Sequence, residues 1–529
     1  MTQVTIPVEP EVGEQPESSA PQLLVPRNLV HRLLSGTSTL GAAVMIERGL
    51  GFAANILAAR IGGAATFGSY SLAITTANNI GTYAAGGIGA TATRFSGQYP
   101  RGSRGYPALA KALVWISLAS ALAAALGLWW GAAPLARLLH KESLTGLLSW
   151  AALSAAGVIA LECCRGFLVG QHRLLGVLVL SGCTGLGMVS LVPIAAHFGP
   201  VPMILSQGGI ALASVGICLL FFRPLGLASP IPIRDPEPLL PIMKRVWSFG
   251  LVQLAGLVGV NAAGWWLTSL IARSDGSMIQ MGFFAIAHQL RNMVALLPTL
   301  LSESSYALMA ADRDGNERTP DRVMAACTSA NTIVAFLLAG VATLGLPWAL
   351  PLFYGKSYVG AEAAAAVALA TAVFHTGTSP AAARLSILSL RLTGLINTAW
   401  AVAVAAFATI LLFHGNALTG AAIYMAAHAV SASLVFVNLR ARRSLPAGTV
   451  LVFCLGSATS LLLSVLAVIR STAIDRAPSL TAVMSIIFVA GAAALIWTGR
   501  RYGLVPGKAA LRKLLDSAVA RVVRQRLPD

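Results

Sequence analysis

Long apolar runs, separated by short polar segments, occupy most of the chain. Crossing the roughly 30 Å hydrocarbon layer of a bilayer takes about 20 apolar residues in a helix. The crossing must be helical because lipid offers no partners to backbone N–H and C=O groups. The runs therefore predict fourteen transmembrane helices. Their expected ranges are 37–59, 67–91, 109–131, 146–169, 174–196, 201–222, 246–271, 282–304, 323–349, 360–382, 393–413, 417–438, 449–469 and 480–499.

Composition supports this assignment. Hydrophobic residues make up 56% of the 529 residues, and charged residues only 11%. Soluble proteins carry about 25% charged residues, so this chain cannot cover a water-facing surface. The six cysteines lie inside apolar runs without metal-ligand spacing, and we interpret them as small core residues. We expect an all-α polytopic membrane protein without a cofactor.

The loops carry basic residues on alternate sides. With a cytoplasmic N-terminus, 28 of the 37 lysines and arginines fall on cytoplasmic segments and 7 on outside segments. The remaining two, Arg48 and Arg291, lie within helices. This distribution follows the positive-inside rule and predicts that both termini are cytoplasmic. It also accounts for the net charge of +18 without a nucleic-acid partner.

The two ends of the chain differ from its centre. Residues 1–27 are acidic and proline-rich, lack the pattern of a signal peptide, and are predicted to be a disordered tail. Residues 500–529 contain KAALRKLLDSAVARVVRQRL, which has an apolar and a basic helical face. We expect this segment to lie on the anionic lipids of the inner leaflet. A solvated helical tail is the alternative.

An internal repeat relates the two halves of the chain. Residues 68–79, GSYSLAITTANN, align with residues 282–293, GFFAIAHQLRNM, at a shift of 214. The repeat equates the first two helices with the seventh and eighth, which run in the same direction, so it predicts two parallel six-helix lobes. The matched positions are Gly68 with Gly282, Tyr70 with Phe284, Leu72 with Ile286, Ala73 with Ala287, and Asn78 with Asn292. The expected domains are an N-lobe at 28–222, a cytoplasmic linker at 223–245, a C-lobe at 246–438, two extra helices at 449–499, and the tails.

Charged and amide side chains within the helices predict a polar cavity. A charge at a helix centre costs about 2.5–3.5 kcal/mol on insertion scales, so such residues usually face an interior. Polar stripes occur on the first, second, seventh and eighth helices, which the repeat makes equivalent. We expect a cavity between the lobes with Arg48 and Arg291 as its cations. The other candidate cavity residues are Asn55, Asn78, Asn261, His288 and Asn292.

The chemistry of these cations favours an anion. The arginine fork makes paired hydrogen bonds to phosphate and stays charged when desolvated. Glu47, next to Arg48, is a candidate site for a coupling proton or Na⁺. The alternative is that these groups bond to each other or to neighbouring helices and only hold the helices together. Glu162 and Arg165, three residues apart, are predicted to form a structural ion pair, and His375 and His428 to be ordinary hydrogen-bonded histidines.

Several short motifs resemble one family. ILAARIGGAATFGSYSLA, followed by AAGGIGATATRF, is similar to the first two helices of polysaccharide and oligosaccharidyl-lipid flippases. This family belongs to the superfamily of the MATE multidrug exporters and the lipid II flippases. Further matches are Arg165-Gly166, Gly170-Gln171, Phe249-Gly250 and Leu352-Phe353-Tyr354-Gly355, so that the resemblance spans about residues 36–440.

The resemblance implies an alternating-access flippase of the bacterial inner membrane. Its cargo would be an undecaprenyl-pyrophosphate-linked oligosaccharide for exopolysaccharide, capsule or O-antigen synthesis. Arg48 and Arg291 occupy places comparable to cationic cavity residues of related flippases. A polysaccharide polymerase and the export machinery are candidate partners.

Other functions remain as alternatives. A MATE-type cation-coupled exporter predicts acidic rather than basic cavity residues, and a lipid II flippase would carry a related cargo. A membrane glycosyltransferase, polymerase or ligase needs carboxylates or a metal site, often with a large loop, and the outside loops here are short. A scaffold without transport activity is the last alternative.

Overall fold

The computed structural model describes residues 27–222, 237–311, 318–411, 415–473 and 477–505, which are helical with short connections and contain no strand. The linker and tail expectations for residues 1–26, 223–236 and 506–529 lie outside these described residues. The elements are α1 (Arg27–Ala85), α2 (Ile88–Gln98), α3 (Tyr106–Leu138), η1 (Glu142–Leu144), α4 (Thr145–Gly170), α5 (Leu174–Ala196), α6 (Pro200–Phe222), α7 (Leu239–Ser274), α8 (Ile279–Ala311), α9 (Arg318–Ala349), η2 (Leu350–Tyr354), η3 (Lys356–Ala361), α10 (Glu362–Leu388), α11 (Leu390–Leu411), α12 (Ala417–Ala441), α13 (Thr449–Thr472) and α14 (Ala477–Arg501).

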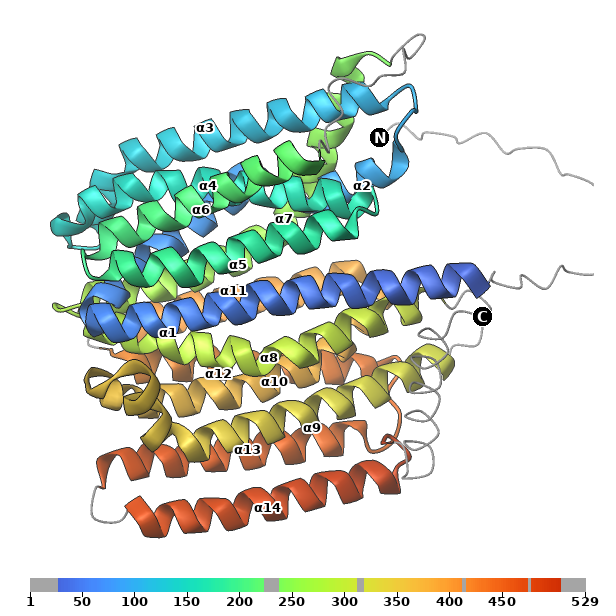
Figure 1. Ribbon diagram of the computed structural model, residues 1–529. Helices are drawn as coiled ribbons and strands as arrows, with labels where there is room; N and C mark the ends of the chain where they lie inside the picture. Colours follow the sequence, from blue (N-terminus) through green and yellow to red (C-terminus); the bar gives the residue numbers. More distant parts are fainter. Residues whose placement is uncertain (1–26, 223–236, 312–317, 412–414, 474–476, 506–529) are drawn as a thin grey trace, which may run out of the picture.

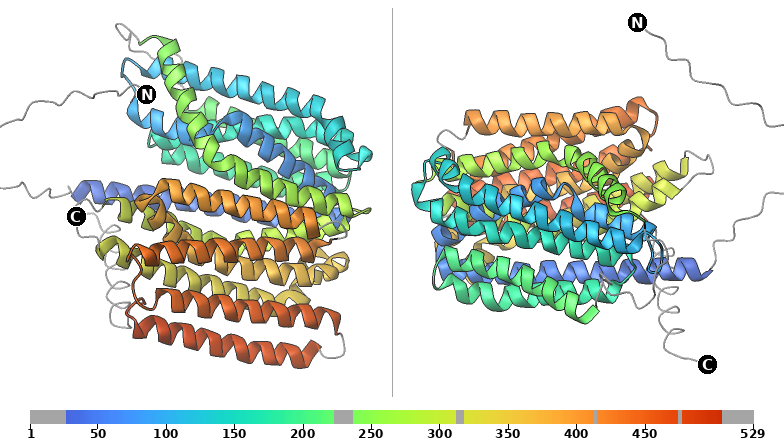
Figure 2. Two further views of the ribbon diagram at one scale, coloured as in Figure 1. Left: turned by 180° about the vertical axis from the view of Figure 1, so that it is seen from behind. Right: turned by 90° about the horizontal axis from the view of Figure 1, so that it is seen from above.

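The α1 element contains two of the predicted spans. Gly63 interrupts it with φ 74° and ψ 173°, a conformation that glycine adopts without a steric penalty. The two arms appear as separate blue segments in Figure 2. With the arms counted separately, the described residues contain fourteen helical segments of membrane-spanning length, as the apolar runs predict. Among the described residues, eleven helices contain a stretch long and apolar enough to cross a membrane, and α7 and α8 are not among them.

The second arm of α1 is shorter than the sequence suggests. A single helix is expected over 67–91, but Gly86 and Gly87 both have positive φ, 53° and 70°. The arm therefore ends at Ala85, and α2 begins in a new direction. The close pairs of spans near 170–174 and 196–201 are separated by short turns, so both are true helix boundaries.

The helices form two lobes and an added pair. Contacts within α1–α6 build the N-lobe, contacts within α7–α12 build the C-lobe, and α13 and α14 pack on α9 and α10. Figure 1 shows this order as bands of colour, with the added pair at one edge. The lobes meet where α1 packs against α8 and where α7 packs against α1, α2 and α3.

A buried ion pair attaches the added helices. Arg470 of α13 is 1% exposed, and its Nε donates to Glu362 Oε1 of α10 at 2.8 Å. Its Nη2 donates to the Thr343 carbonyl of α9 at 2.9 Å, and its Nη1 to Thr481 Oγ1 of α14 at 3.2 Å. One side chain thus ties four helices together.

Two apolar pairs that the repeat aligns are buried alike in the two halves. Leu72 and Ile286, which the alignment matches, are each 0% exposed, and Ala73 and Ala287 are 1% and 0% exposed. These positions face the lobe cores in the second arm of α1 and in α8. The aligned residues are therefore buried in the core of each lobe.

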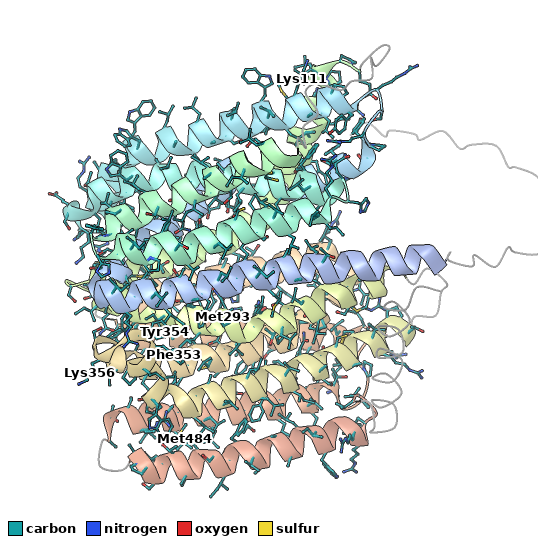
Figure 3. The ribbon with its side chains drawn as sticks, viewed as in Figure 1. Lys111, Met293, Phe353, Tyr354, Lys356 and Met484 are labelled. Carbon is teal, nitrogen blue, oxygen red and sulfur yellow. The ribbon has the colours of Figure 1, made fainter. Side chains whose placement is uncertain are left out.

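The start of α1 and the end of α14 lie at the same end of the helix bundle, which we call the terminal end (Figure 1). Figure 3 places Lys111 at the terminal end, Lys356 at the opposite end, and Met293 midway between them. Lys111 and Lys356, which the predicted topology assigns to opposite sides of the membrane, thus lie at opposite ends of the bundle.

Candidate functional site

A cavity of about 670 Å³ lies between the two lobes. Its walls come from both arms of α1 and from α5 and α6 on one side, and from α7, α8 and α12 on the other. Met293, midway along the bundle in Figure 3, is one of its lining residues. Six amide side chains line it: Asn55, Asn79, Gln207, Asn261, Gln289 and Asn292. The aromatic lining residues are Phe52, Phe67, Tyr70, Trp265, Phe284 and Tyr424.

Arg48 brings a positive charge into the cavity. It lines the cavity together with Gly51, Phe52 and Asn55, which follow it by three, four and seven positions and therefore share one helical face. Arg48 is exposed, and no hydrogen bond or ion pair joins its guanidinium to another described residue. The Arg48 guanidinium thus lies on the cavity-facing side of α1, and its role in binding stays a prediction.

Glu47 points to a different side of α1. Arg165 Nη2 of α4 donates to both of its carboxylate oxygens, at 2.6 and 2.7 Å, and Ser181 Oγ of α5 donates to Oε2 at 2.7 Å. Glu47 is not a lining residue of the cavity. Arg165 also makes the predicted ion pair with Glu162, at 3.1 Å. The carboxylate beside Arg48 is therefore bonded inside the N-lobe.

Arg291 does not line the cavity itself but contacts residues that do. Its Nη2 donates to Asn292 Oδ1 at 3.0 Å and lies 3.3 Å from His288 Nε2. Its guanidinium carbon lies 4.9 Å from the centre of the Tyr424 ring. Arg291 itself is not a lining residue, but the three residues that hold it are. The predicted second cation is thus next to the cavity and covered by its wall.

One candidate residue lies one position away from the lining. Asn78 is exposed but does not line the cavity, whereas Asn79 does. The Asn79 amide donates to the Thr75 carbonyl at 2.9 Å. Adjacent residues differ by about 100° around a helix, so this one-residue difference changes the face. The other predicted cavity residues, Asn55, Asn261, His288 and Asn292, all line the cavity.

Tyr70 and Gln207 line the cavity but are not among the residues expected from the sequence. The Tyr70 hydroxyl donates to Gln207 Oε1 and joins α1 to α6 across the cavity wall. The repeat offered a signal for Tyr70, since its partner Phe284 also lines the cavity. Nothing in the run around Gln207 distinguishes it from other polar residues in apolar helices.

The cavity is closed at the end opposite the termini. A Cβ atom on Gly68 would lie 2.2 Å from the Met278 carbonyl oxygen, and one on Gly282 would lie 2.2 Å from the Ala64 carbonyl oxygen. The backbones of α1 and α8 are thus in direct contact there. Across the same end, Arg60 Nη1 donates to the Leu352 carbonyl. Lys141 Nζ donates to the Asp275 and Gly276 carbonyls at 2.6 and 3.0 Å.

The lining residues favour binding over bond-breaking chemistry. They include one arginine, one histidine and six amides, and no carboxylate. Among the described residues, no group of three or more His, Cys, Asp or Glu side chains is placed to hold a metal ion. The cavity can donate hydrogen bonds to an anion and to hydroxyl groups, and its aromatic rings can cover apolar faces.

Solved structures that share this fold include a flippase and a multidrug transporter. The lipid II flippase MurJ in an inward closed conformation is 12% identical, with a TM-score of 0.64 over 88% of this chain and 98% of that one. An inward-facing multidrug resistance MATE family transporter of the MOP superfamily is 15% identical, with a TM-score of 0.62 over 75% of this chain and 94% of that one. No protein of curated function is significantly similar in sequence.

Sequence comparison identifies a family directly. The family described as polysaccharide biosynthesis protein matches residues 33–306, slightly more than half of the chain. This range includes all but the first residues of the N-lobe and the cavity-lining parts of α7 and α8. The chain is a multi-pass membrane protein with the fold shared by MurJ and the MATE transporters, and it belongs to the polysaccharide biosynthesis protein family.

Proposed function

We propose that this protein is a flippase for a polyprenyl-pyrophosphate-linked oligosaccharide. It carries the cargo by alternating access from the cytoplasmic to the outer leaflet of a bacterial inner membrane. The single observation that carries this proposal is the charge of the cavity, which contains the unpaired Arg48 and no carboxylate. A carrier of organic cations needs the opposite charge.

The lining suits both parts of such a head group. A guanidinium binds diphosphate oxygens through charge-assisted hydrogen bonds, which are about twice as strong as neutral ones. Amides match sugar hydroxyls, and aromatic rings match the apolar faces of sugars. The volume of about 670 Å³ falls within the range of about 300–1,000 Å³ for small-molecule sites. The lipid tail would stay in the bilayer.

The direction follows from the predicted topology. The positive-inside rule assigns the terminal end to the cytoplasm. The contacts of Gly68 with α8 then close the cavity on the outer side. Cargo would enter from the cytoplasmic leaflet, and separation of α1 from α8 would release it outside. The product would serve exopolysaccharide, capsule or O-antigen synthesis.

A vesicle assay tests the proposal. The purified protein is reconstituted with a fluorescent undecaprenyl-pyrophosphate oligosaccharide, and a membrane-impermeant quencher reports the fraction that has changed leaflet. Arg48→Ala should slow flipping about 10- to 100-fold, since hydrogen bonds to charged groups contribute about 1.5–3 kcal/mol. Arg48→Lys should keep part of the rate because it keeps the charge but loses the fork.

Arg137→Ala is the matched control. Arg137 is an exposed arginine of α3 whose Nε donates only within its own helix, to the Ala133 carbonyl at 3.4 Å. Its loss should leave the rate unchanged. Wild-type flipping by Arg48→Ala at equal protein levels would contradict the proposal. Faster movement of lipid II, or transport of an organic cation with no flipping, would favour the corresponding alternative function.

A further inference from the structure

One amide on the C-lobe wall of the cavity has an oxygen without a partner. Gln289 of α8 lines the cavity, and its Oε1 is buried and accepts no hydrogen bond within the described residues. No other buried side-chain nitrogen or oxygen of the described lining residues lacks a partner. An amide oxygen can only accept hydrogen bonds. Because a buried acceptor without a donor is costly, the empty cavity lacks a donor group at this position.

The nitrogen of the same amide fixes its orientation. Gln289 Nε2 donates to the Phe52 carbonyl of α1 at 3.2 Å. A carbonyl oxygen only accepts, so a flipped amide would bring two acceptors together there. The N–H side of the Gln289 amide therefore faces α1 of the N-lobe, and Oε1 is directed away from that contact.

The oxygens of three other lining amides are already engaged. Gln207 Oε1 accepts from the Tyr70 hydroxyl, Asn292 Oδ1 accepts from Arg291 Nη2 at 3.0 Å, and Asn79 Oδ1 accepts from the Tyr83 hydroxyl at 3.4 Å. Each of these oxygens is occupied by a neighbouring side chain, so none of them requires a donor from a ligand. Gln289 differs from them because its neighbours leave its acceptor free.

The chemistry of the missing donor excludes the charged parts of a cargo. Ionised phosphates and carboxylates are acceptors, so neither can bond to Gln289 Oε1. Hydroxyl and amide N–H groups can donate to it, and both occur on neutral sugars. Among the described lining residues, Arg48 is the only arginine and there is no lysine, so a diphosphate at Arg48 leaves no second lining cation for an acidic sugar. The wall at Gln289 therefore suits the sugar part of a head group.

The spacing between Arg48 and Gln289 suits a diphosphate followed by one sugar. Arg48 precedes Phe52 by four residues, which is about 6 Å along a helix. Long helical side chains lean towards the N-terminus of their helix, which for the first arm of α1 is the terminal end. Met293, one turn after Gln289 in α8, lies midway along the bundle (Figure 3). A diphosphate held by Arg48 would thus place the next unit of the cargo at the level of Gln289.

We propose that Gln289 is a specificity-determining residue that accepts a hydrogen bond from a hydroxyl or amide N–H group of the sugar joined to the diphosphate. The inference rests on the proposed function, because it names the class of cargo that the same cavity selects. That cargo has a neutral first sugar with a donor facing α8. A site built to bond a donor rejects an analogue without it, since its own polar group is then left unpaired. A carboxylate facing Gln289 Oε1 would set two acceptors against each other.

Binding of matched cargo analogues to the full-length protein in lipid nanodiscs tests this inference. The probes are undecaprenyl-pyrophosphoryl glucose, a series of its deoxy analogues that each lack one hydroxyl, and the corresponding glucuronosyl compound. Wild type should bind at least one deoxy analogue about tenfold more weakly than the glucosyl parent, as expected for the loss of one hydrogen bond to a buried acceptor. The glucuronosyl compound should bind more weakly than the parent.

Two variants assign the discrimination to a single amide. Gln289→Met keeps the length of the side chain and removes both polar atoms. It should bind the parent about tenfold more weakly and no longer distinguish it from that deoxy analogue, because two partners in contact do not contribute additively. Gln207→Met is the matched control, since it removes a lining amide whose oxygen is already engaged, and it should keep the discrimination. A merely structural role of the Gln289 bond to Phe52 would lower the affinity for all probes equally.

Three results would overturn the inference. One is equal binding of every deoxy analogue by wild type, because ordered water would then satisfy Oε1. Another is a discrimination that Gln289→Met retains. The third is tighter binding of the glucuronosyl compound than of the glucosyl parent. Discrimination that depends on Gln289, but without flipping in the vesicle assay, would instead remove the proposed function and leave Gln289 as a residue that recognises the sugar.

Discussion

Both lobes place an arginine at the cavity, but Arg48 of the N-lobe lines it, whereas Arg291 of the C-lobe lies behind residues that line it. On the N-lobe face, Arg48 is exposed while the neighbouring Glu47 is bonded to Arg165 on the other side of α1. On the C-lobe face, Arg291 has only neutral polar and aromatic partners. In the N-lobe, Glu47 points away from the cavity. In the C-lobe, no described carboxylate pairs with Arg291.

This difference shows two ways in which a chain can keep carboxylates away from the surface of a cavity. The N-lobe needs a specific partner for Glu47, so its charge depends on a single ion pair. The C-lobe has no such pair at Arg291, whose Nε and Nη1 have no hydrogen-bond partner within the described residues.

The largest effect is expected when the N-lobe pair is broken. Arg165→Gln leaves the Glu47 carboxylate without its counter-ion. Losing one partner of a fully buried pair costs about 3–5 kcal/mol. Here the two side chains are 25% and 22% exposed, so we expect about 2 kcal/mol, measured by thermal unfolding in detergent. Flipping should fall as well, since the free carboxylate would compete for Arg48.

The double variant Glu47→Gln/Arg165→Gln is the control for that prediction. It removes both charges and should recover most of the flipping rate and part of the stability. A double variant that is as slow as Arg165→Gln would show that the pair does more than remove an acid from the cavity.

An intermediate effect is expected at the closed end, which both lobes share. Gly282→Ala places a Cβ against the Ala64 carbonyl oxygen. Overpacking of this kind costs about 1–3 kcal/mol, so the closed state should lose population by about 5- to 100-fold. Labelling of a Ser71→Cys cavity probe by an impermeant thiol reagent added from that side should speed up. Gly345→Ala in α9, where a Cβ meets no atom within 4 Å, should change nothing.

The smallest effect compares two adjacent asparagines on the N-lobe face. Asn79→Ala removes an amide from the cavity and should slow flipping about three- to tenfold, as for the loss of one hydrogen bond. Asn78→Ala should leave the vesicle rate unchanged because Asn78 is outside the lining. The reverse order would mean that the second arm of α1 rotates during transport.

The helices could be predicted because a chain that crosses lipid must satisfy its backbone hydrogen bonds internally, which few structures other than a helix can do. Each apolar run had to become a spanning helix, and even the short turn between Gly170 and Leu174 was foreseen. The break at Gly86 and Gly87 was not, since glycine is also common within membrane helices. Local periodicity does not reveal which glycines take positive φ.

The candidate site was predicted less completely, for a related reason. Arg48, Asn55 and Asn261 line the cavity as expected. The partner of Glu47 is 118 residues away, so no local pattern could show that this acid is engaged. The aromatic and histidine side chains near Arg291 come from α8, α10, α11 and α12, so no pattern within one helix shows that they meet.

The contact between Gly68 and Gly282 has a consequence for the origin of the chain. Matching residues of two repeats touch each other only near the twofold axis that relates them. That axis therefore passes between these two glycines, along the membrane normal. Two separate copies of a single lobe would bring the same glycine against itself there, so a homodimeric ancestor could have sealed its outer end before gene fusion joined the halves.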